Sequence, residues 1–340
     1  MVGCIAEEYY IAVDLGATKT RIALCTRSEI IEKTVYYTPK HGDEYTIAES
    51  IYNTVVTKWK NLVSNIKAVG IASIGPLDIK EGKVVHASNV PIRNFELLRP
   101  LVKKFKKPVY VVNDCVAAAW GEKYYGDAVN YDNFIYLTLS TGVGAGVVVD
   151  GNLLIGKMGN AHEVGHIVID FTSDLQCGCG GRGHWEVFSG GANTHKVLKY
   201  LAERSDITGY SELKERVLKG EQIDAKTMFD YFRKGDPLAK KAVDLYIQAT
   251  SAGIASIVNV YDPELVIIGG SIFLNNIDVL YEPIVSRIRE NIVTNPPIIK
   301  PTRLGDDVGL YGALAIAVYT PRKIIEIQGR LINEIIGVTL

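Results

Sequence analysis

Two stretches of this chain share one pattern, and this internal similarity limits its possible folds more than any other feature. Residues 11–25, IAVDLGATKTRIALC, align without gaps on residues 135–149, IYLTLSTGVGAGVVV. Each stretch has two short β-rich runs around a glycine-containing turn, which is the pattern of a β-hairpin. A repeated unit indicates duplication, so the sequence predicts two related lobes rather than one large sheet.

Strands and helices are expected to alternate around these hairpins. Strands are predicted within 66–79, where a Gly-Pro loop ends the run, at 108–114 and at 264–270, and helices at about 46–64, 115–126, 192–260 (with loops) and 276–292. This alternation is typical of an α/β fold. We expect a small N-terminal lobe over 1–115, completed by a helix near 309–320, and a larger lobe over 116–308. The tail, 321–340, has no specific assignment beyond an amphipathic element capping the fold.

The composition excludes several classes of protein. The 340 residues are 47% hydrophobic and 22% charged with a formal net charge of -1, which fits neither a disordered tail nor a broad basic surface. We therefore expect no nucleic-acid partner. Five cysteines in so long a chain are not a disulfide framework and indicate a reducing compartment. Because no run of 18 apolar residues and no signal-peptide pattern occurs, a cytoplasmic protein without a membrane partner is expected.

The glycine turns DLGATKT (14–20) and STGVGAG (140–146) are candidate phosphate-binding loops. Such turns expose consecutive backbone N–H groups, which can hold phosphate oxygens. Lys19 would add charge, and Thr18, Thr20 and Thr141 would add hydroxyl donors. Ordinary hairpin turns also contain glycine, so either turn alone is weak evidence. The presence of two such turns favours a triphosphate-binding site. A Walker A string is absent, and Val147 breaks the Rossmann fingerprint.

Carboxylates follow two of the predicted strands. Asp14 ends the first strand, where it would reach a phosphate-bound Mg²⁺ directly or through water, or it is simply a solvated turn residue. Asn113 and Asp114 end a strand and open a helix, so either is a candidate N-cap. Alternatively, Asp114 accepts a proton from a substrate hydroxyl.

The string HEVGH (162–166) is a literal H-E-x-x-H, the motif of zinc proteases, and Glu186 follows at a suitable distance for a third ligand. The protease motif needs a helix, but Gly165 lies inside the string and the β-branched run IVI follows it. A Cys₂His₂ set of His166, Cys177, Cys179 and His184 is the better zinc site, and it is structural because no position remains for a catalytic water. His162 is then a spare surface or loop residue.

Taken in order, these strings resemble the ROK family (repressor, open reading frame, kinase) of sugar kinases, within the actin-like and hexokinase-like ATPases. The matching strings are DLGATKT, VVND with AAAWGE, LSTGVGAGVVVDG, AHEVGH, CGCGGRGHWE and VIIGGS, spanning residues 11 to about 275. The resemblance implies a two-lobed α/β fold of duplicated ribonuclease-H-like domains, with ATP in the cleft between the lobes.

The resemblance also implies an activity, a hexokinase or glucokinase reaction that transfers the ATP γ-phosphate to a hexose hydroxyl, O6, with Asp114 as general base. The implied sugar-binding residues are Asn113, Asp114, Glu163, His166 and Glu186, with Gly75 and Asn89 shaping the pocket. The implied ATP and Mg²⁺ residues are Asp14, Gly16, Thr18, Lys19, Thr20, Thr141, Gly142, Gly144, Gly269, Gly270 and Ser271. ATP, Mg²⁺ and a structural Zn²⁺ are the expected cofactors, and a homodimer is expected.

Three residues depart from the family pattern. His184 stands where a third cysteine is usual, Ala17 where a second glycine is common, and His162 where a glycine usually precedes the glutamate. Two alternatives stay open: a kinase of fructose, mannose or an N-acetylhexosamine, and a non-catalytic sugar-binding regulator. The family's repressors carry an added helix-turn-helix domain, for which there is no room before the first predicted strand.

Overall fold

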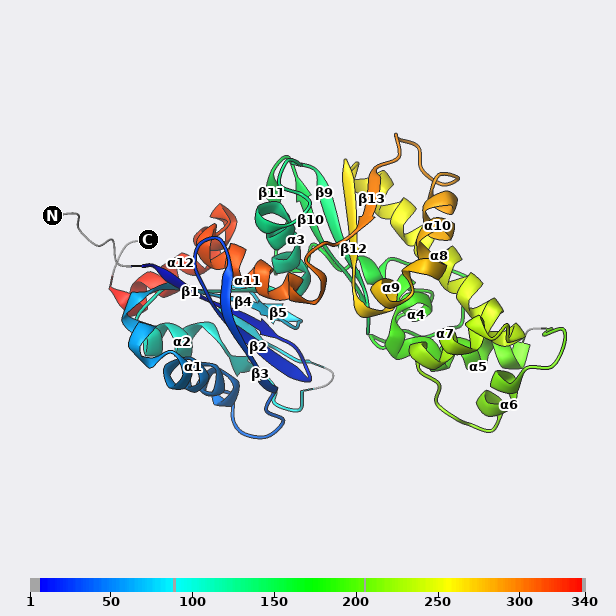
Figure 1. The fold of residues 1–340 in the computed structure, drawn as a ribbon, viewed down its shortest axis with the longest axis horizontal. Helices are drawn as coiled ribbons and strands as arrows, with labels where there is room; N and C mark the ends of the chain where they lie inside the picture. Colours follow the sequence, from blue (N-terminus) through cyan, green and yellow to red (C-terminus); the bar gives the residue numbers. More distant parts are fainter. Residues whose placement is uncertain (1–6, 88–89, 205, 338–340) are drawn as a thin grey trace. The chain divides into compact units, whose positions relative to one another are not determined.

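The computed structural model describes residues 7–87, 90–204 and 206–337 (Figure 1). The chain forms two compact units. Unit 1 consists of residues 1–132, 146–162 and 302–340, and unit 2 of residues 133–145 and 163–301. Among the described residues, every helix is too short or too polar to cross a membrane.

Unit 1 contains a five-stranded sheet in the order β3-β2-β1-β4-β8. Its strands are β1 (Tyr9–Leu15), β2 (Lys19–Cys25), β3 (Ile30–Tyr37), β4 (Ile66–Ser73) and β8 (Val109–Asn113). The β1–β2 and β2–β3 pairs are antiparallel, whereas β1, β4 and β8 are mutually parallel. β4 lies between two parallel neighbours and is buried on both faces, which explains its nearly continuous apolar sequence.

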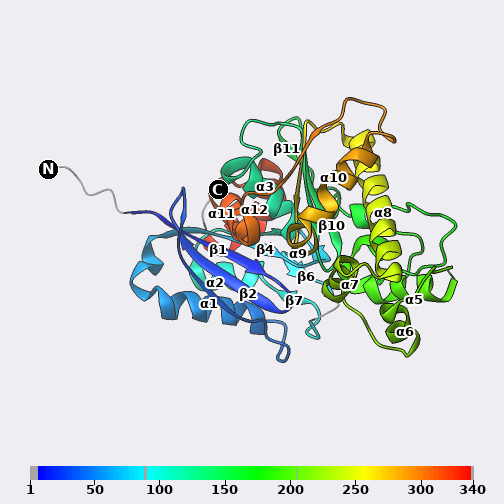
Figure 2. The same cartoon turned by 45° about the vertical axis from the view of Figure 1, so that its right-hand side comes forward.

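A small antiparallel sheet and a set of helices complete this unit. The sheet consists of β5 (Leu77–Asp78), β6 (Lys83–Val84) and β7 (Phe95–Glu96). The helices are α1 (Thr46–Lys58), η1 (Lys60–Asn65), α2 (Leu98–Phe105), α3 (Asp114–Tyr125), η4 (Gly305–Asp307), α11 (Val308–Val318) and α12 (Arg322–Ile336). Figures 1 and 2 show α1 and α2 on one side of the five-stranded sheet and α11 on the other.

The second five-stranded sheet repeats this arrangement, with the order β11-β10-β9-β12-β13. Its strands are β9 (Phe134–Leu139), β10 (Val143–Val149), β11 (Asn152–Leu153), β12 (Leu265–Gly269) and β13 (Ile298–Pro301). β9, β12 and β13 are parallel, like β1, β4 and β8. In both sheets, therefore, the first strand of the hairpin pairs with the second hairpin strand on one side and is followed by two parallel strands on the other side. This shared order confirms the duplicated α/β fold.

Apart from β9, β12, β13 and the start of β10, unit 2 consists mostly of helices. They are η2 (Val164–His166), α4 (Trp185–Ser189), η3 (Gly191–Asn193), α5 (Thr194–Arg204), α6 (Glu212–Leu218), α7 (Ala225–Arg233), α8 (Pro237–Tyr261), α9 (Ser271–Asn275) and α10 (Ile277–Ile288). α8 contacts α4, α5, α7 and α10. It begins with proline at its first position, and the Asp236 side chain accepts from the N–H groups of Leu238 and Ala239.

The close packing of α11 against α3 depends on small residues. α11 has the sequence VGLYGALAIAV and is almost entirely buried, in contact with α3, β1 and β4. A Cβ atom added at Gly312 would lie 2.4 Å from the Ala117 carbonyl oxygen of α3. The backbones of the two helices therefore approach too closely for a side chain at this position.

We predict opposite effects of alanine at two helical glycines of unit 1. Gly312→Ala should lower stability by about 1–3 kcal/mol because the backbone of α3 must move. Gly329→Ala should raise stability by about 0.5–1 kcal/mol, since its new methyl group meets only the Ile325 side chain, at 3.5 Å, and alanine favours a helix. Thermal midpoints of the two variants check this, and shifts in the same direction would contradict it.

Candidate functional site

The β1–β2 turn carries the predicted phosphate-binding residues of unit 1. The Gly16 N–H donates to the Lys19 carbonyl at 3.0 Å, and a Cβ at Gly16 would lie 2.9 Å from that same oxygen. Thr18 and Lys19 are exposed, as expected of phosphate-facing groups. Thr20 is different, because it is fully buried and its hydroxyl lies 2.9 Å from the Thr38 hydroxyl. Thr20 was predicted as a hydroxyl donor to phosphate, whereas its buried hydroxyl is paired with that of Thr38 and supports the turn from inside.

Asp14, near the end of β1, is held by an arginine. The Arg21 Nε donates to Asp14 Oδ2 at 2.8 Å, and Nη2 of the same guanidinium binds the same oxygen. Burial raises the pKa of Asp14, and the positive charge of Arg21 opposes this shift. Because both nitrogens of Arg21 bind Oδ2, Oδ1 is the oxygen that would meet a cation or its water.

The junction of β8 and α3 positions Asn113 and Asp114. Asn113 is the N-cap of α3, and both its Oδ1 and Asp114 Oδ1 accept from the Cys115 N–H at 2.8 Å. Asp114 is partly exposed at the N-terminus of the helix, where the helix dipole stabilises a carboxylate. A Cβ at Gly75 would lie 3.4 Å from Asn113 Nδ2, so the Gly75 loop flanks this junction. Asn89 lies outside the described residues.

The β9–β10 turn of unit 2 lies against the start of α9. The Ser140 N–H donates to the Gly142 carbonyl at 3.0 Å, and the Ser140 and Ser271 hydroxyls lie 2.9 Å apart. Gly270 has φ +92°, and a Cβ there would lie 2.4 Å from the Leu139 carbonyl oxygen. Only glycine permits this approach, which brings the two predicted nucleotide-binding segments of the unit together.

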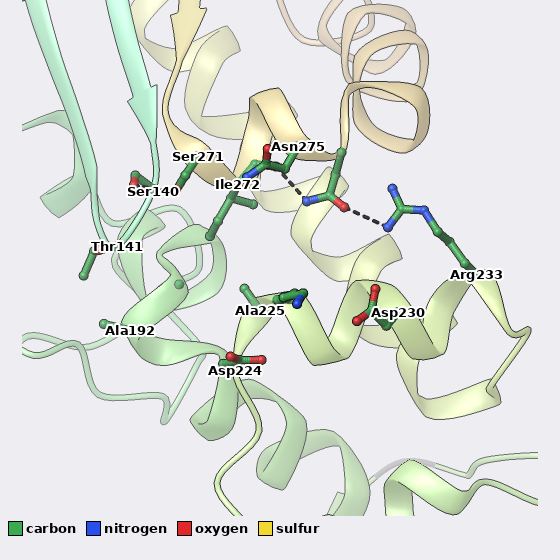
Figure 3. Close-up of a pocket in the computed structure, with 13 residues that line it drawn as sticks. Ser140, Thr141, Ala192, Asp224, Ala225, Asp230, Arg233, Ser271, Ile272 and Asn275 are labelled. Carbon is green, nitrogen blue, oxygen red and sulfur yellow. Dashed lines mark hydrogen bonds between the residues drawn. The ribbon is translucent and has the colours of Figure 1, made fainter. Parts of the chain in front are cut away.

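A cavity of about 610 Å³ opens beside this turn within unit 2 (Figure 3). It is lined by Ser140, Thr141, Gly191, Ala192, Asp224, Ala225, Lys226, Asp230, Arg233, Ser271, Ile272, Asn275 and Asn276. Thr141 and Ser271 were predicted to bind nucleotide. The other predicted residues of this unit, Gly142, Gly144, Gly269 and Gly270, are not among the lining residues.

The wall that α7 contributes to this cavity was not anticipated from the sequence. Figure 3 shows Asp224 and Asp230 on the side opposite Ser271. Asp224 is the N-cap of α7 and accepts from the Thr227 N–H at 2.8 Å. Aspartate is a preferred N-cap residue and is compatible with the start of a helix, but nothing in that preference indicates that the helix borders a cavity.

Four predicted zinc ligands come together in unit 2. One ligand atom from each of His166, Cys177, Cys179 and His184 lies within 4.8 Å of all the others. Cys179 Sγ lies 3.3 Å from His184 Nδ1. His166 Nδ1 is buried without a hydrogen-bond partner. A buried polar atom without a partner needs an explanation, and a bound metal ion would provide one. The residues therefore fit a tetrahedral Zn²⁺ site.

The pKa shifts of His184 and Cys177 act in opposite directions on cation binding. Burial, and then the neighbouring His166 ring, lower the pKa of His184, which favours the neutral imidazole that binds metals. Burial is the main cause that raises the pKa of the Cys177 thiol, and the Glu186 carboxylate adds to it. A bound divalent cation would reverse that preference by stabilising the thiolate.

Two of the predicted sugar-binding carboxylates adjoin this cluster. Glu186 Oε2 accepts from the Val143 N–H at 3.0 Å, and Cys177 Sγ lies 3.4 Å from Glu186 Oε1. Glu163 is exposed, with Oε2 3.4 Å from His166 Nε2. A carboxylate on the far nitrogen of a ligand histidine is a common outer partner of zinc sites. Unit 2 thus brings Glu163, His166 and Glu186 together around the cluster.

The HEVGH stretch does not form the α-helix of a protease site. Residues Val164–His166 are a single 3₁₀ turn followed by extended backbone at Ile167. His162 lies in a turn, as predicted, but it is not on the surface. It is 4% exposed, and its Nε2 lies 2.9 Å from the Gly159 carbonyl oxygen.

Comparison with known proteins gives the same family as the motifs. A family model described as the ROK family matches residues 10–319. The chain belongs to the ROK family. Among ROK relatives, a glucokinase from Pyrobaculum calidifontis is 42% identical over 315 residues, which cover 93% of this chain and 97% of the relative.

Solved ROK structures share the fold. The ROK hexokinase from Thermus thermophilus superposes with a TM-score of 0.79 at 29% identity, covering 92% of this chain and 98% of that one. A ROK glucokinase from Streptomyces griseus, in complex with glucose and AMPPNP, has a TM-score of 0.67 at 28% identity and covers 91% and 99%. The predicted actin-like ATPase fold is confirmed by these neighbours.

We predict about one zinc ion per chain of this ROK protein, held by the Cys₂His₂ set. Cys179→Ser should lower the zinc content and the thermal midpoint, and chelation of the wild type should lower the midpoint as well, because structural zinc contributes folding free energy. His162→Gln is the matched control and should keep its zinc. Elemental analysis decides: zinc lost from His162→Gln and kept by Cys179→Ser would indicate the H-E-x-x-H ligands instead.

Proposed function

We propose that this chain, an ATP-dependent sugar kinase of the ROK family, transfers the γ-phosphate to O6 of glucose with Asp114 as the general base. The observation that supports the base is the β8–α3 junction, where a partly exposed carboxylate lies at a strand end beside the Asn113 cap. The identity to a named glucokinase over nearly the whole chain supports the sugar.

In the proposed reaction the O6 hydroxyl attacks the γ-phosphorus. The new O6–P bond forms as the bond from phosphorus to the bridging oxygen breaks, the hydroxyl proton passes to Asp114, and ADP leaves. Such transfers need positioning and charge neutralisation more than covalent chemistry. The backbone N–H groups of the two glycine turns and the Lys19 ammonium would supply these, and a base such as Asp114 contributes about 10²- to 10⁴-fold.

Glu163, His166 and Glu186 are the proposed sugar-hydroxyl ligands. Glu186 is oriented before substrate arrives, because Val143 N–H holds one carboxylate oxygen and Cys177 contacts the other. Several fixed carboxylates and an imidazole suit the vicinal hydroxyls of a pyranose, and fixing them in advance lowers the entropy cost of binding. Glucose is proposed over fructose, mannose and N-acetylhexosamines on the names of the relatives.

The cofactor proposals follow the same residues. The cavity bordered by Ser271, Thr141 and Asp224 is the proposed nucleoside site. Mg²⁺ bound to the ATP phosphates would neutralise their charge, with Asp14 as the candidate for holding its water. Zinc at the four-ligand cluster would keep Glu186 and His166 in place, a structural role. The homodimer implied by the family resemblance stays a prediction.

We predict that Asp114→Asn lowers kcat by about 10²- to 10⁴-fold while sugar affinity changes little, because the amide keeps the shape and loses the basicity. Asp132→Asn is a suitable control, since its side chain is 71% exposed. Single-turnover assays with glucose and calorimetric binding of the sugar measure the two quantities. Turnover of Asp114→Asn within a few-fold of the wild type would refute the assignment of Asp114 as the general base.

Substrate analogues test the sugar and the hydroxyl. We expect ADP release with glucose to exceed that with fructose, mannose and N-acetylmannosamine. 6-Deoxyglucose should bind and give no phosphorylated product, because it lacks the attacking hydroxyl. Phosphorus NMR of the product identifies the esterified oxygen, and a phosphate on any other carbon would contradict the O6 assignment.

A further inference from the structure

The C-terminal helix α12 buries one polar side chain among apolar ones. Ile324, Gln328 and Ile332, at four-residue spacing, form its buried stripe, and each is 0% exposed. The helix contacts α2 and β8 of unit 1. An apolar residue at 328 would continue the stripe without burying an amide, so the glutamine needs another explanation.

The Gln328 amide binds the edge of the sheet. β8 is the last strand of its sheet, and its Val111 is paired in register with Ile71 of β4. The Val111 N–H donates to Gln328 Oε1 at 3.1 Å, and Gln328 Nε2 donates to the Val111 carbonyl at 2.7 Å. The side-chain amide therefore makes the two hydrogen bonds that a further strand would make with this residue.

The same amide reaches a second segment. Gln328 Nε2 also donates to the Ile79 carbonyl at 2.9 Å. Ile79 follows β5, which begins two residues after Gly75, and Gly75 flanks Asn113. One side chain thus joins the turn after β5 to the strand that ends at Asn113, using both N–H groups and the oxygen of its amide.

We propose that Gln328 is a positioning residue of the kinase reaction, which holds β8 and the turn after β5 so that Asp114 meets the sugar in the productive geometry. The inference rests on the proposed function, which makes Asp114 the base. Val111 is three residues before Asp114 in a strand that runs directly into α3. A displacement of about 1 Å at a reacting group can cost about 10²-fold in rate, so a loose strand end is enough to impair the reaction.

The test uses the full chain with Gln328→Met, which keeps the length of the side chain and removes all three hydrogen bonds. We expect kcat to fall about tenfold to 100-fold and KM for glucose to rise less. Ile332→Ala is the matched control: it weakens the same helix without a polar contact, and its kcat should stay near the wild type. Assays are run at a temperature where both variants are folded.

The variant Gln328→Glu should make kcat depend on pH in a way that a general loss of packing would not. A protonated carboxyl keeps one acceptor and one O–H donor, whereas the carboxylate has no donor and faces two carbonyl oxygens. Relative to the wild type, kcat of this variant should be highest at low pH and fall as pH rises. This variant also serves if Gln328→Met does not fold.

Several results would overturn the proposal. One is a kcat of Gln328→Met equal to that of the wild type, or lowered no more than that of Ile332→Ala. Another is a ratio of the kcat of Gln328→Glu to the wild-type kcat that does not change with pH. Asp114→Asn is assayed in parallel to separate the two hypotheses. If Asp114→Asn is fully active, Asp114 is not the base, and the positioning role of Gln328, which depends on that assignment, is refuted as well. If Asp114→Asn is inactive while Gln328→Met has wild-type activity, the positioning role of Gln328 is refuted and the assignment of Asp114 as base stands.

Discussion

The parallel pairing of strands within each sheet is the constraint on which the proposed chemistry depends. Parallel strands end at the same edge, and in open α/β sheets ligands bind beyond that edge. In unit 1 this edge carries Asp14, the Gly75 loop and Asp114, after β1, β4 and β8. In unit 2 it carries Ser140 and Gly270, after β9 and β12. Each sheet therefore gathers functional groups that are far apart in the sequence.

A second constraint is the sharing of groups between binding and structure in unit 2. Glu186 is held by a backbone N–H of the glycine-rich hairpin and contacts a cysteine of the metal cluster. His166 offers one nitrogen to the cluster and the other to Glu163. A change in this four-residue cluster would thus reach, through single contacts, the carboxylates that are proposed to hold the sugar.

Much of the fold was predictable because the signals were local. Two hairpins with the same pattern predicted the duplication, and the small-residue run at 309–319 predicted α11. The spacing of Cys177, Cys179 and His184 predicted the four-residue cluster that could hold a metal ion. The α7 wall of the cavity and the role of α12 were not predictable, because each depends on tertiary packing. Thr20, predicted as a hydroxyl donor, is buried in β2. His162, predicted as a surface or loop residue, lies in a turn but is buried, and in both cases the burial comes from tertiary packing.

The route of the chain through unit 1 has a consequence for the order of assembly. The unit is built from three separate segments, and the last of them, 302–340, supplies α11 and α12. The Gln328 amide closes the edge of a strand made 217 residues earlier in the chain. During synthesis, β8 emerges long before the helix that covers it, so its open edge is exposed to wrong pairing until α12 has been made.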